Sequence, residues 1–176
     1  MDLGLDQSFG RLVHSKLSVF HSRVTDLITR KTKYDPFENL SSARLQGIEV
    51  DVGVIPMNYL YLNMSYHYLD AKDLDTDEQL EYRPQHTFSV SAEVTAFQEL
   101  TLRLYLDYVS KCYYYSKDQL QYLDEYYLFD VNLSKRIFSL WEIWTACNNM
   151  FDVYYEDEAG FPLPGREFSI GLRVKL

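Results

Sequence analysis

The sequence predicts an all-β protein whose antiparallel strands form the wall of a transmembrane β-barrel. Three observations support this fold class. Apolar and polar residues alternate with a period of two along most of the chain, as in strands that have one apolar face. No run of about 18 apolar residues is present, so the sequence offers no membrane-spanning helix. The segments between the alternating runs are alternately short and long, as the connections of membrane barrels are.

The alternation is clearest in seven runs, in which the apolar residues share one side and no charged residue falls on that side. In residues 60–68, for example, Leu, Met and Tyr at even positions alternate with Tyr, Asn, Ser and His at odd positions. The other six runs cover residues 48–54, 87–94, 100–108, 129–133, 141–147 and 168–176. Two weaker strands are expected at 3–9 and 14–28. The chain therefore contains about nine meandering strands, each long enough to cross a bilayer when tilted, which takes about 9–11 residues.

The connections alternate in length along the whole chain. The short ones lie near Gly10 and at 55–58, 96–99 and 136–139, and the long ones cover 29–42, 70–84, 111–125 and 152–165. Barrels of the bacterial outer membrane have short periplasmic turns and long extracellular loops. The pattern therefore predicts a chain in the bacterial outer membrane with its C-terminus on the periplasmic side.

Aromatic residues make up 16% of the chain, with 16 tyrosines against seven glycines. Tyrosine favours strands and also membrane–water interfaces, where its ring lies in apolar material and its hydroxyl stays hydrated. Tyrosines at strand ends that meet long loops are Tyr66, Tyr68, Tyr108, Tyr113, Tyr114, Tyr115, Tyr126, Tyr127, Tyr154 and Tyr155. Aromatic residues near the short turns are Tyr59, Phe97, Phe138 and Trp141. Two such bands suit a bilayer, with a soluble β-sandwich that has tyrosine-rich rims as the alternative.

The formal net charge of −9 argues against a nucleic-acid partner, because no basic stripe is present to neutralise phosphates. Acidic residues cluster in one segment, at Asp70, Asp73, Asp75, Asp77, Glu78 and Glu81. Residues 73–84 begin like a calcium loop. Glu78 takes the place of its central glycine and Pro84 that of its final glutamate, so we expect a hydrated acidic loop. Cys112 and Cys147 match no zinc spacing, and a disulfide between them is left open.

The chain shows no pattern of catalytic residues. The four histidines, His14, His21, His67 and His86, form no metal-binding spacing. Ser65 and His67 share one face of a strand, but nothing marks a nucleophile or an oxyanion hole. We therefore expect no enzymatic activity, no metal site and no cofactor.

Four motifs, in order along the chain, resemble segments near the C-terminus of one receptor family. They are Ala43-Arg44-Leu45-Gln46-Gly47-Ile48-Glu49, Tyr82-Arg83-Pro84-Gln85-His86, Asn149-Met150-Phe151-Asp152-Val153-Tyr154-Tyr155 and Pro164-Gly165-Arg166-Glu167-Phe168. The family patterns are Ala-x-x-x-Gly-(Ile/Val)-Glu, Arg-Pro-x-His, Asn-Leu-Phe-Asp-x-x-Tyr and Pro-Gly-Arg-x-Phe. On these motifs, residues 43–176 resemble the C-terminal β-barrel region of TonB-dependent outer-membrane receptors. The first forty residues resemble it only in general character.

The resemblance implies that residues 1–176 are the C-terminal portion of a larger barrel of about 22 strands with a plugged lumen. Neither the family's plug domain nor a signal peptide is recognisable in the sequence, so we expect both in preceding sequence. The whole receptor would take up a scarce nutrient, such as a ferric siderophore, haem or cobalamin, by TonB-coupled transport. A complete small outer-membrane barrel with a structural or pore role is the alternative.

The resemblance also implies partners. These are outer-membrane lipid, the plug domain, the remaining barrel strands, the TonB complex and the barrel-assembly machinery. The assembly signal is expected at Phe168, Ile170, Leu172, Val174 and Leu176, although outer-membrane barrels usually end in an aromatic residue. Charges expected to face the lumen, and to pair with one another or with a plug, are Glu49, Asp51, Glu93, Arg103, Asp107, Glu142, Arg173 and Lys175. No single substrate-binding residue is assigned, and the long loops rich in Tyr and Asp are the candidates.

Overall fold

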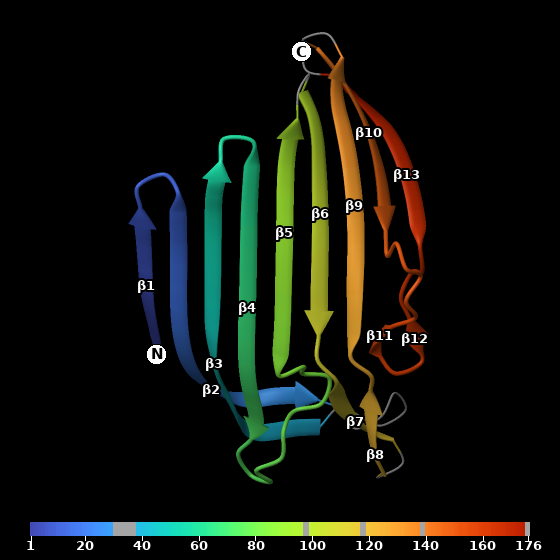
Figure 1. The fold of residues 1–176 in the computed structure, drawn as a ribbon. Coiled ribbons are helices and arrows are strands. Elements are labelled where there is room, and N and C mark those ends of the chain that lie inside the picture. The colour runs from blue at the N-terminus through green and yellow to red at the C-terminus, as the bar shows by residue number, and fades with distance from the viewer. Residues whose placement is uncertain (30–37, 97–98, 117–118, 138–139, 175–176) are drawn as a thin grey trace.

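A computed structural model describes residues 1–29, 38–96, 99–116, 119–137 and 140–174. It contains a nine-stranded antiparallel sheet, in which each strand pairs with the next strand of the sheet along the chain (Figure 1). Its strands are β1 (Asp2–Phe9), β2 (Val13–Thr29), β3 (Glu38–Met57), β4 (Leu60–Asp73), β5 (His86–Ala96), β6 (Leu100–Val109), β9 (Tyr126–Ile137), β10 (Trp141–Asn148) and β13 (Glu167–Val174). The predicted meander of nine strands is therefore confirmed.

Several strand ends at the long-loop side differ from the prediction. The expected loop at 29–42 is wrong at its second end, because β3 already begins at Glu38, whereas β2 ends at Thr29, close to the expected strand end at 28. The expected loop at 111–125 contains the hairpin β7 (Cys112–Ser116) and β8 (Gln119–Leu123). The loop at 152–165 contains the short pair β11 (Glu156–Glu158) and β12 (Phe161–Pro162). Alternation records which residues face an apolar medium, whereas backbone pairing continues beyond that medium.

The register confirms the predicted faces of the sheet. Leu62, Ala92, Leu104 and Val131 lie opposite one another across β4, β5, β6 and β9, and form part of an apolar face. In the described residues, the hydrophobic side chains that are buried are three alanines, Ala43, Ala71 and Ala146. Large apolar residues instead stand exposed on this face; Ile170, for example, is 79% exposed. A single layer of this kind needs an apolar medium to cover it, and a bilayer supplies one.

One row of aromatic residues crosses the apolar face near the long loops. Tyr66, Phe88, Tyr108 and Tyr127 are cross-strand neighbours on four adjacent strands, and the Tyr108 and Tyr127 ring centroids are 4.7 Å apart. From Tyr127 to Ile137 at the opposite end, ten residues of β9 span about 34 Å along the strand, or about 26 Å in height at a tilt of about 40°. That height matches the apolar band of an outer-membrane barrel, about 25 Å.

The opposite end of the apolar face carries the second aromatic band in part. Tyr59 and Trp141 are exposed there, and the expected Phe97 and Phe138 lie outside the described residues. The apolar side of β9 continues to Lys135, which the register places between Leu100 and Ile143. A lysine at this height can bury its aliphatic chain against the wall and extend its ammonium group to the headgroups.

The ends of β2 and β3 bend and run across the lower ends of neighbouring strands (Figure 1). Gly47, the glycine of the first motif, lies opposite Phe20 in this ribbon. A Cβ atom at Gly47 would lie 2.7 Å from Phe20 Cζ and 2.1 Å from the carbonyl oxygen of Tyr68. Only glycine leaves room for the Phe20 ring against the backbone at this point, so this motif residue has a structural role.

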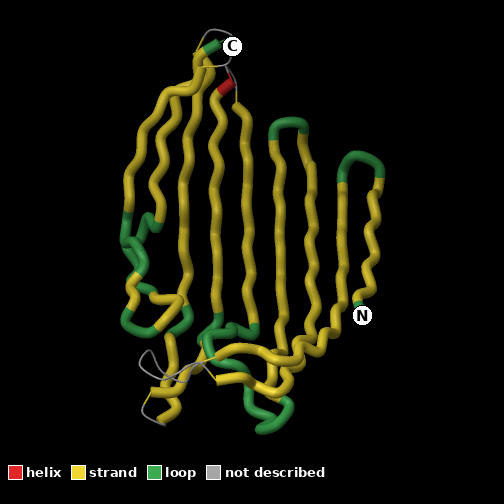
Figure 2. Tube along the Cα trace, turned by 180° about the vertical axis from the view of Figure 1, so that it is seen from behind, coloured by secondary structure: helices red, strands yellow, loops and turns green. Residues whose placement is uncertain are grey.

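The short turns and the C-terminal end of the chain lie at one end of the sheet, and the long loops lie at the other (Figure 2). β1 and β13 form the two edges, and they do not pair with each other. In the described residues, no helix is long and apolar enough to cross a membrane.

The assignment of the two faces can be tested by introducing one charge on each face in turn. The substitution Leu104→Arg, on the lipid side of β6, should lower the free energy of unfolding by about 2–4 kcal/mol, because it places a charge in hydrocarbon. Ser91→Arg, on the lumen side of β5, should cost much less. The measurement is urea unfolding of the protein in phosphatidylcholine vesicles. Equal losses for Leu104→Arg and Ser91→Arg would contradict the assigned faces.

Candidate ligand-contact surface at the long-loop end

Three connections gather at the end of the sheet opposite the short turns (Figure 2). They are residues 74–85, the segment 110–125 that contains β7 and β8, and the segment 149–166 that contains β11 and β12. We refer to them together as the long-loop surface. They are the segments that the sequence marks as candidates for ligand contact, and their tyrosines hold them to one another.

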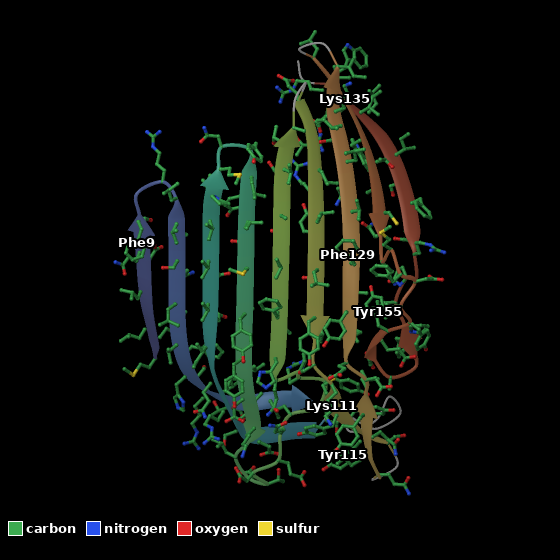
Figure 3. The ribbon with its side chains drawn as sticks, viewed as in Figure 1. Phe9, Lys111, Tyr115, Phe129, Lys135 and Tyr155 are labelled. Carbon is green, nitrogen blue, oxygen red and sulfur yellow. The ribbon has the colours of Figure 1, made fainter. Side chains whose placement is uncertain are left out.

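The first link joins the β4–β5 connection to the β7–β8 hairpin. The backbone N–H of Tyr82 donates to the carbonyl oxygen of Tyr113 at 3.0 Å. The rings of Tyr82 and Tyr114 stack, with centroids 5.5 Å apart and an interplanar angle of 15°. Tyr115, labelled in Figure 3, packs edge-on against Tyr113 at 6.1 Å. These contacts hold two connections that are separate in the sequence as one surface.

The second link joins the start of β9 to the segment that contains β11 and β12. The Tyr126 and Tyr155 rings are 4.7 Å apart, and the Tyr126 hydroxyl donates to Asp157 Oδ1 at 2.9 Å. On β6, the Tyr108 hydroxyl donates to Glu125 Oε2 at 3.3 Å. Phenol-to-carboxylate hydrogen bonds of this kind are charge-assisted and stronger than neutral ones.

Burial and nearby acids raise the pKa of Tyr82 and Tyr113 on this surface. Burial raises the pKa of Tyr113 well above its usual range, and Tyr115, Glu78 and Glu81 raise it further. Burial followed by the charge of Glu81 also raises the pKa of Tyr82. In the described residues, the Tyr113 hydroxyl is enclosed and has no hydrogen-bond partner. The surface therefore presents neutral phenols, which can stack or donate hydrogen bonds, rather than phenolates.

Asn149 organises the turn that follows β10. Its backbone N–H donates to Asp130 Oδ1 at 2.8 Å, and its side-chain amide donates to the Val153 carbonyl at 2.8 Å. Its Oδ1 accepts from the Val153 N–H at 2.8 Å. Asn149 and Asp152 both have positive φ angles, 48° and 56°, which Asn and Asp adopt more readily than most residues. The third motif therefore forms a turn that is held by hydrogen bonds of Asn149.

The fourth motif closes the same segment. Asp152 Oδ1 accepts a hydrogen bond from the Arg166 backbone N–H at 2.8 Å. A Cβ atom at Gly165 would lie 2.6 Å from that Asp152 oxygen, so the glycine lets the carboxylate reach the backbone. The Phe129 and Phe151 rings stack at 5.7 Å on the outer side. The third and fourth motifs thus pack together.

A pocket of about 250 Å³ lies between the lumen side of the last strands and this segment. It is lined by Leu128, Asp130, Asn148, Asn149, Tyr155, Pro164, Gly165 and Glu167. Burial, followed by the charges of Asp157, Asp130 and Glu167, raises the pKa of Tyr155. The pocket combines two carboxyl groups with a protonated phenol, so its chemistry suits a polar or basic group more than an anion.

The acidic segment folds as a loop with internal hydrogen bonds. The Asp73 carboxylate accepts from the Asp75 N–H at 2.8 Å, and the Asp73 N–H donates to the Glu78 carbonyl at 2.8 Å. Lys72 Nζ lies 3.4 Å from Asp77 Oδ1. Across the described part of the chain, no group of three or more His, Cys, Asp or Glu side chains could hold a metal ion.

The charges on the lumen side pair largely within the sheet. Arg103 Nε lies 2.6 Å from Glu93 Oε2, and Arg173 Nη1 lies 2.8 Å from Glu142 Oε1. Two other carboxylates accept hydrogen bonds from serine hydroxyls: Ser65 donates to Asp51 at 2.7 Å, and Ser89 donates to Asp107 at 2.5 Å. His67 Nδ1 lies 3.7 Å from Glu49, and Lys175 is outside the described residues. The predicted mutual pairing is thus found for Glu93 with Arg103 and for Glu142 with Arg173, whereas the three other described carboxylates have serine or histidine partners.

The same contacts bear on catalysis. The Ser65 hydroxyl donates a hydrogen bond to Asp51, whereas His67 lies beside Glu49. Ser65 and His67 therefore have different partners. The other histidines lie on two strands, β2 and β5: His14 lies beside Asp6, His21 beside Gln46, and His86 stacks with Tyr66 at 6.1 Å. Cys112 and Cys147 are both free thiols, on β7 and β10. The arrangement does not assemble a nucleophile and a base.

The Asn149 turn gives a local test. Replacing Asn149 by alanine removes three hydrogen bonds from a residue that is 4% exposed, and should favour opening of the segment by about 1–3 kcal/mol. Trypsin or chymotrypsin should then cleave between 150 and 166 in the folded receptor. Asn148→Ala, at the exposed neighbouring position, is the matched control and should leave the cleavage rate near wild type. Equal cleavage rates in the two variants would argue against the assigned role.

Comparison with known proteins finds a matching family model and solved structures with a similar fold. A family model described as TonB dependent receptor-like, beta-barrel matches residues 1–150. No curated protein is significantly similar to the chain. The solved structure of the copper transporter OprC is 18% identical, with a TM-score of 0.81, over 98% of this chain and 30% of that one.

Two further solved structures agree. The ferric-catecholate import receptor Fiu from E. coli K12 is 15% identical with a TM-score of 0.78, over 98% of this chain and 27% of that one. The iron transporter FrpB from Neisseria meningitidis is 14% identical with a TM-score of 0.78, over 98% and 29%. The chain spans less than a third of the length of these proteins. These three proteins are an import receptor, a copper transporter and an iron transporter. With the family model covering 150 residues, the chain belongs to the TonB-dependent receptor β-barrel family.

Proposed function

We propose that this chain forms the C-terminal wall of an outer-membrane receptor that takes up a scarce nutrient by TonB-coupled transport. The observation that carries the proposal is the nine-stranded wall with an uncovered apolar face and an aromatic row, in a chain matched over residues 1–150 by the receptor-barrel model. The remaining strands and the plug domain would come from preceding sequence. The paired charges on the lumen side make a polar wall that a plug can contact.

The orientation follows from the two kinds of connection. Long loops face the outside and short turns face the periplasm in bacterial barrels, which puts the C-terminus in the periplasm. On β13, the outward residues Phe168, Ile170, Leu172 and Val174 are between 44% and 79% exposed at a sheet edge. These four residues line an apolar edge of the described sheet, of the kind that the barrel-assembly machinery would need to reach, and Leu176 lies outside the described residues. TonB would act on the plug of the whole receptor.

The ligand is of the ferric siderophore, haem or cobalamin class. Similar folds include a ferric-catecholate import receptor and a copper transporter. Tyr122 on β8 is 55% exposed, and Lys111 Nζ lies 5.5 Å from its ring centroid. Tyr154 is 73% exposed. Exposed aromatic rings can stack on a large planar or conjugated ligand, which makes these two tyrosines the first contact residues to test.

Uptake by the full-length receptor tests the proposal. In a strain that lacks the receptor, restoring it should rescue growth on one limiting source among a ferric hydroxamate, a ferric catecholate, haemin and cyanocobalamin. The rescue should disappear when TonB is deleted, because the transport energy comes through that complex. Rescue that persists without TonB would point to a simple pore instead. No rescue with any of the four sources would contradict the nutrient class.

Tyr122 tests the ligand-contact surface. Its replacement by alanine should weaken binding of the rescuing nutrient by roughly ten-fold, because one stacked ring contributes about 1–3 kcal/mol to binding of a planar ligand. Binding is measured with the purified full-length receptor by isothermal titration calorimetry. Tyr59→Ala is the matched control, since Tyr59 is 54% exposed at the opposite end of the sheet. The same loss in both variants would mean that the effect is structural and not a ligand contact.

A further inference from the structure

One pocket on the lumen side of the wall holds two carboxyl groups close together. Its volume is about 250 Å³, and side chains of β9, β10 and β13 line it. Asn148 on β10 is the direct cross-strand partner of Glu167 on β13. The residues next to Asn148 and Asp130, which are Cys147 and Val131, pair with each other across β10 and β9. The amide of Asn148 therefore stands between Asp130 and Glu167, which we refer to as the pocket carboxylates.

The cations nearest to the pocket carboxylates along the strands have other partners. Arg166 is the neighbour of Glu167 in the sequence, but its Cζ atom lies 5.9 Å from the ring centroid of Phe168, on the outer side of the wall. Arg103, on the lumen side of β6, is held by Glu93 at 2.6 Å. Among the described residues, no ion pair includes either pocket carboxylate. The negative charge of the pocket is therefore left without a basic partner in the described part of this chain.

The phenol of Tyr155, labelled in Figure 3, is surrounded by the same negative charges. Burial, followed by the charges of Asp157, Asp130 and Glu167, raises its pKa. These three charges are all carboxylates, whereas a basic side chain inside the pocket would lower the pKa of the phenol. The pocket is thus negative and lined by oxygen atoms, which is what a cationic group requires.

The acceptors of the pocket match an ammonium group in number. A primary ammonium has three N–H donors and no acceptor. One oxygen of Asp130 accepts from the Asn149 backbone N–H at 2.8 Å, which holds this carboxylate in place, and the second oxygen has no donor among the described residues. The Glu167 carboxylate and the Asn148 side-chain oxygen have no hydrogen-bond donor in the described part of the chain either. Three side chains can therefore each accept one of the three N–H groups.

Size and height restrict what the pocket can hold. Sites for drug-sized ligands have volumes of about 300–1,000 Å³, so a pocket of about 250 Å³ takes a side group and not a whole iron complex. From Tyr127 in the aromatic row to Asp130, three residues of β9 span about 10 Å along the strand, or about 8 Å in height at a tilt of about 40°. The pocket thus lies on the inner wall, just below the level of the aromatic row, where a ligand that enters from the long-loop end can reach it.

We propose that this pocket binds the primary ammonium group of a ferric siderophore, and that the receptor selects siderophores that carry such a group. The ammonium lies between Asp130 and Glu167 and donates its third hydrogen bond to the Asn148 oxygen, while the iron-binding part of the molecule stays in the lumen. The inference rests on the proposed function, and it narrows the nutrient class. Haem, with its propionates, and an anionic ferric catecholate without an amine have no group that suits the pocket.

The test uses two forms of one iron complex. A linear ferric trihydroxamate that ends in a primary amine is compared with the same complex after N-acetylation, and binding to the purified full-length receptor is measured by isothermal titration calorimetry. The wild-type receptor should bind the amine form about ten-fold more tightly or better, because a hydrogen bond to a charged group contributes about ten-fold or more. Glu167→Gln should remove most of this preference and leave binding of the acetylated form unchanged. Asp124→Asn removes one negative charge at an exposed position of the same end, and should behave like wild type.

Three results would overturn the proposal. These are equal affinity of the wild type for the two forms, equal weakening of both forms by Glu167→Gln, or the same loss of preference in Asp124→Asn. Folding is checked by the heat-dependent shift of the barrel in gel electrophoresis. A second variant, Asn148→Lys, places a cation between the pocket carboxylates and should also abolish the preference, so the test does not depend on one substitution.

A basic side chain of the plug is the competing occupant of the pocket. In that case the wild type would show no preference for the amine form, and Glu167→Gln would lower the thermal unfolding temperature of the ligand-free receptor. Binding of neither form would overturn the ammonium site as well. TonB-dependent rescue of growth by haemin, cyanocobalamin or a ferric catecholate would then leave the transport proposal standing, so the two proposals fail on different results.

Discussion

Backbone hydrogen bonding in a medium without water is the constraint on which the rest of the structure depends. In hydrocarbon, each unpaired N–H or C=O costs several kcal/mol, so every strand must have a hydrogen-bonded neighbour. The ladder from β1 to β13 meets this demand within the sheet, and leaves two edges, at β1 and β13. Once the backbone is satisfied in this way, one face is free to be apolar and the other free to be polar.

The two faces then follow different rules. On the outer face, large side chains remain exposed and the aromatic row marks the level of the interface. On the lumen face, charges are acceptable because partners stand directly across the ladder, as with Glu93 and Arg103 or Glu142 and Arg173. The same period of two therefore produces lipid contact on one side and a network of ion pairs on the other.

Beyond the membrane, side-chain contacts of tyrosines and of an asparagine hold the connections in place, as backbone hydrogen bonds do within the sheet. The Tyr82–Tyr114 stack and the Tyr126–Asp157 hydrogen bond tie together connections that are distant in the sequence. Asn149 and Gly165 show that motif residues typical of the family can stabilise the conformation of the loop in which they lie. The exposed rings of Tyr122 and Tyr154 are the side chains that we propose for ligand contact on this surface.

The sequence by itself determined the strands, their faces and the parity of the connections, because burial against lipid leaves a period-two pattern in each strand. It also indicated the ion-pairing lumen and the tyrosine-rich ends. It located β2 to about one residue at each end, but it did not determine where β3 begins, since pairing beyond the membrane leaves no alternation. The contacts between loops depend on register between strands. Only the tertiary structure decides that register, because residues twenty or more positions apart become neighbours through backbone pairing alone.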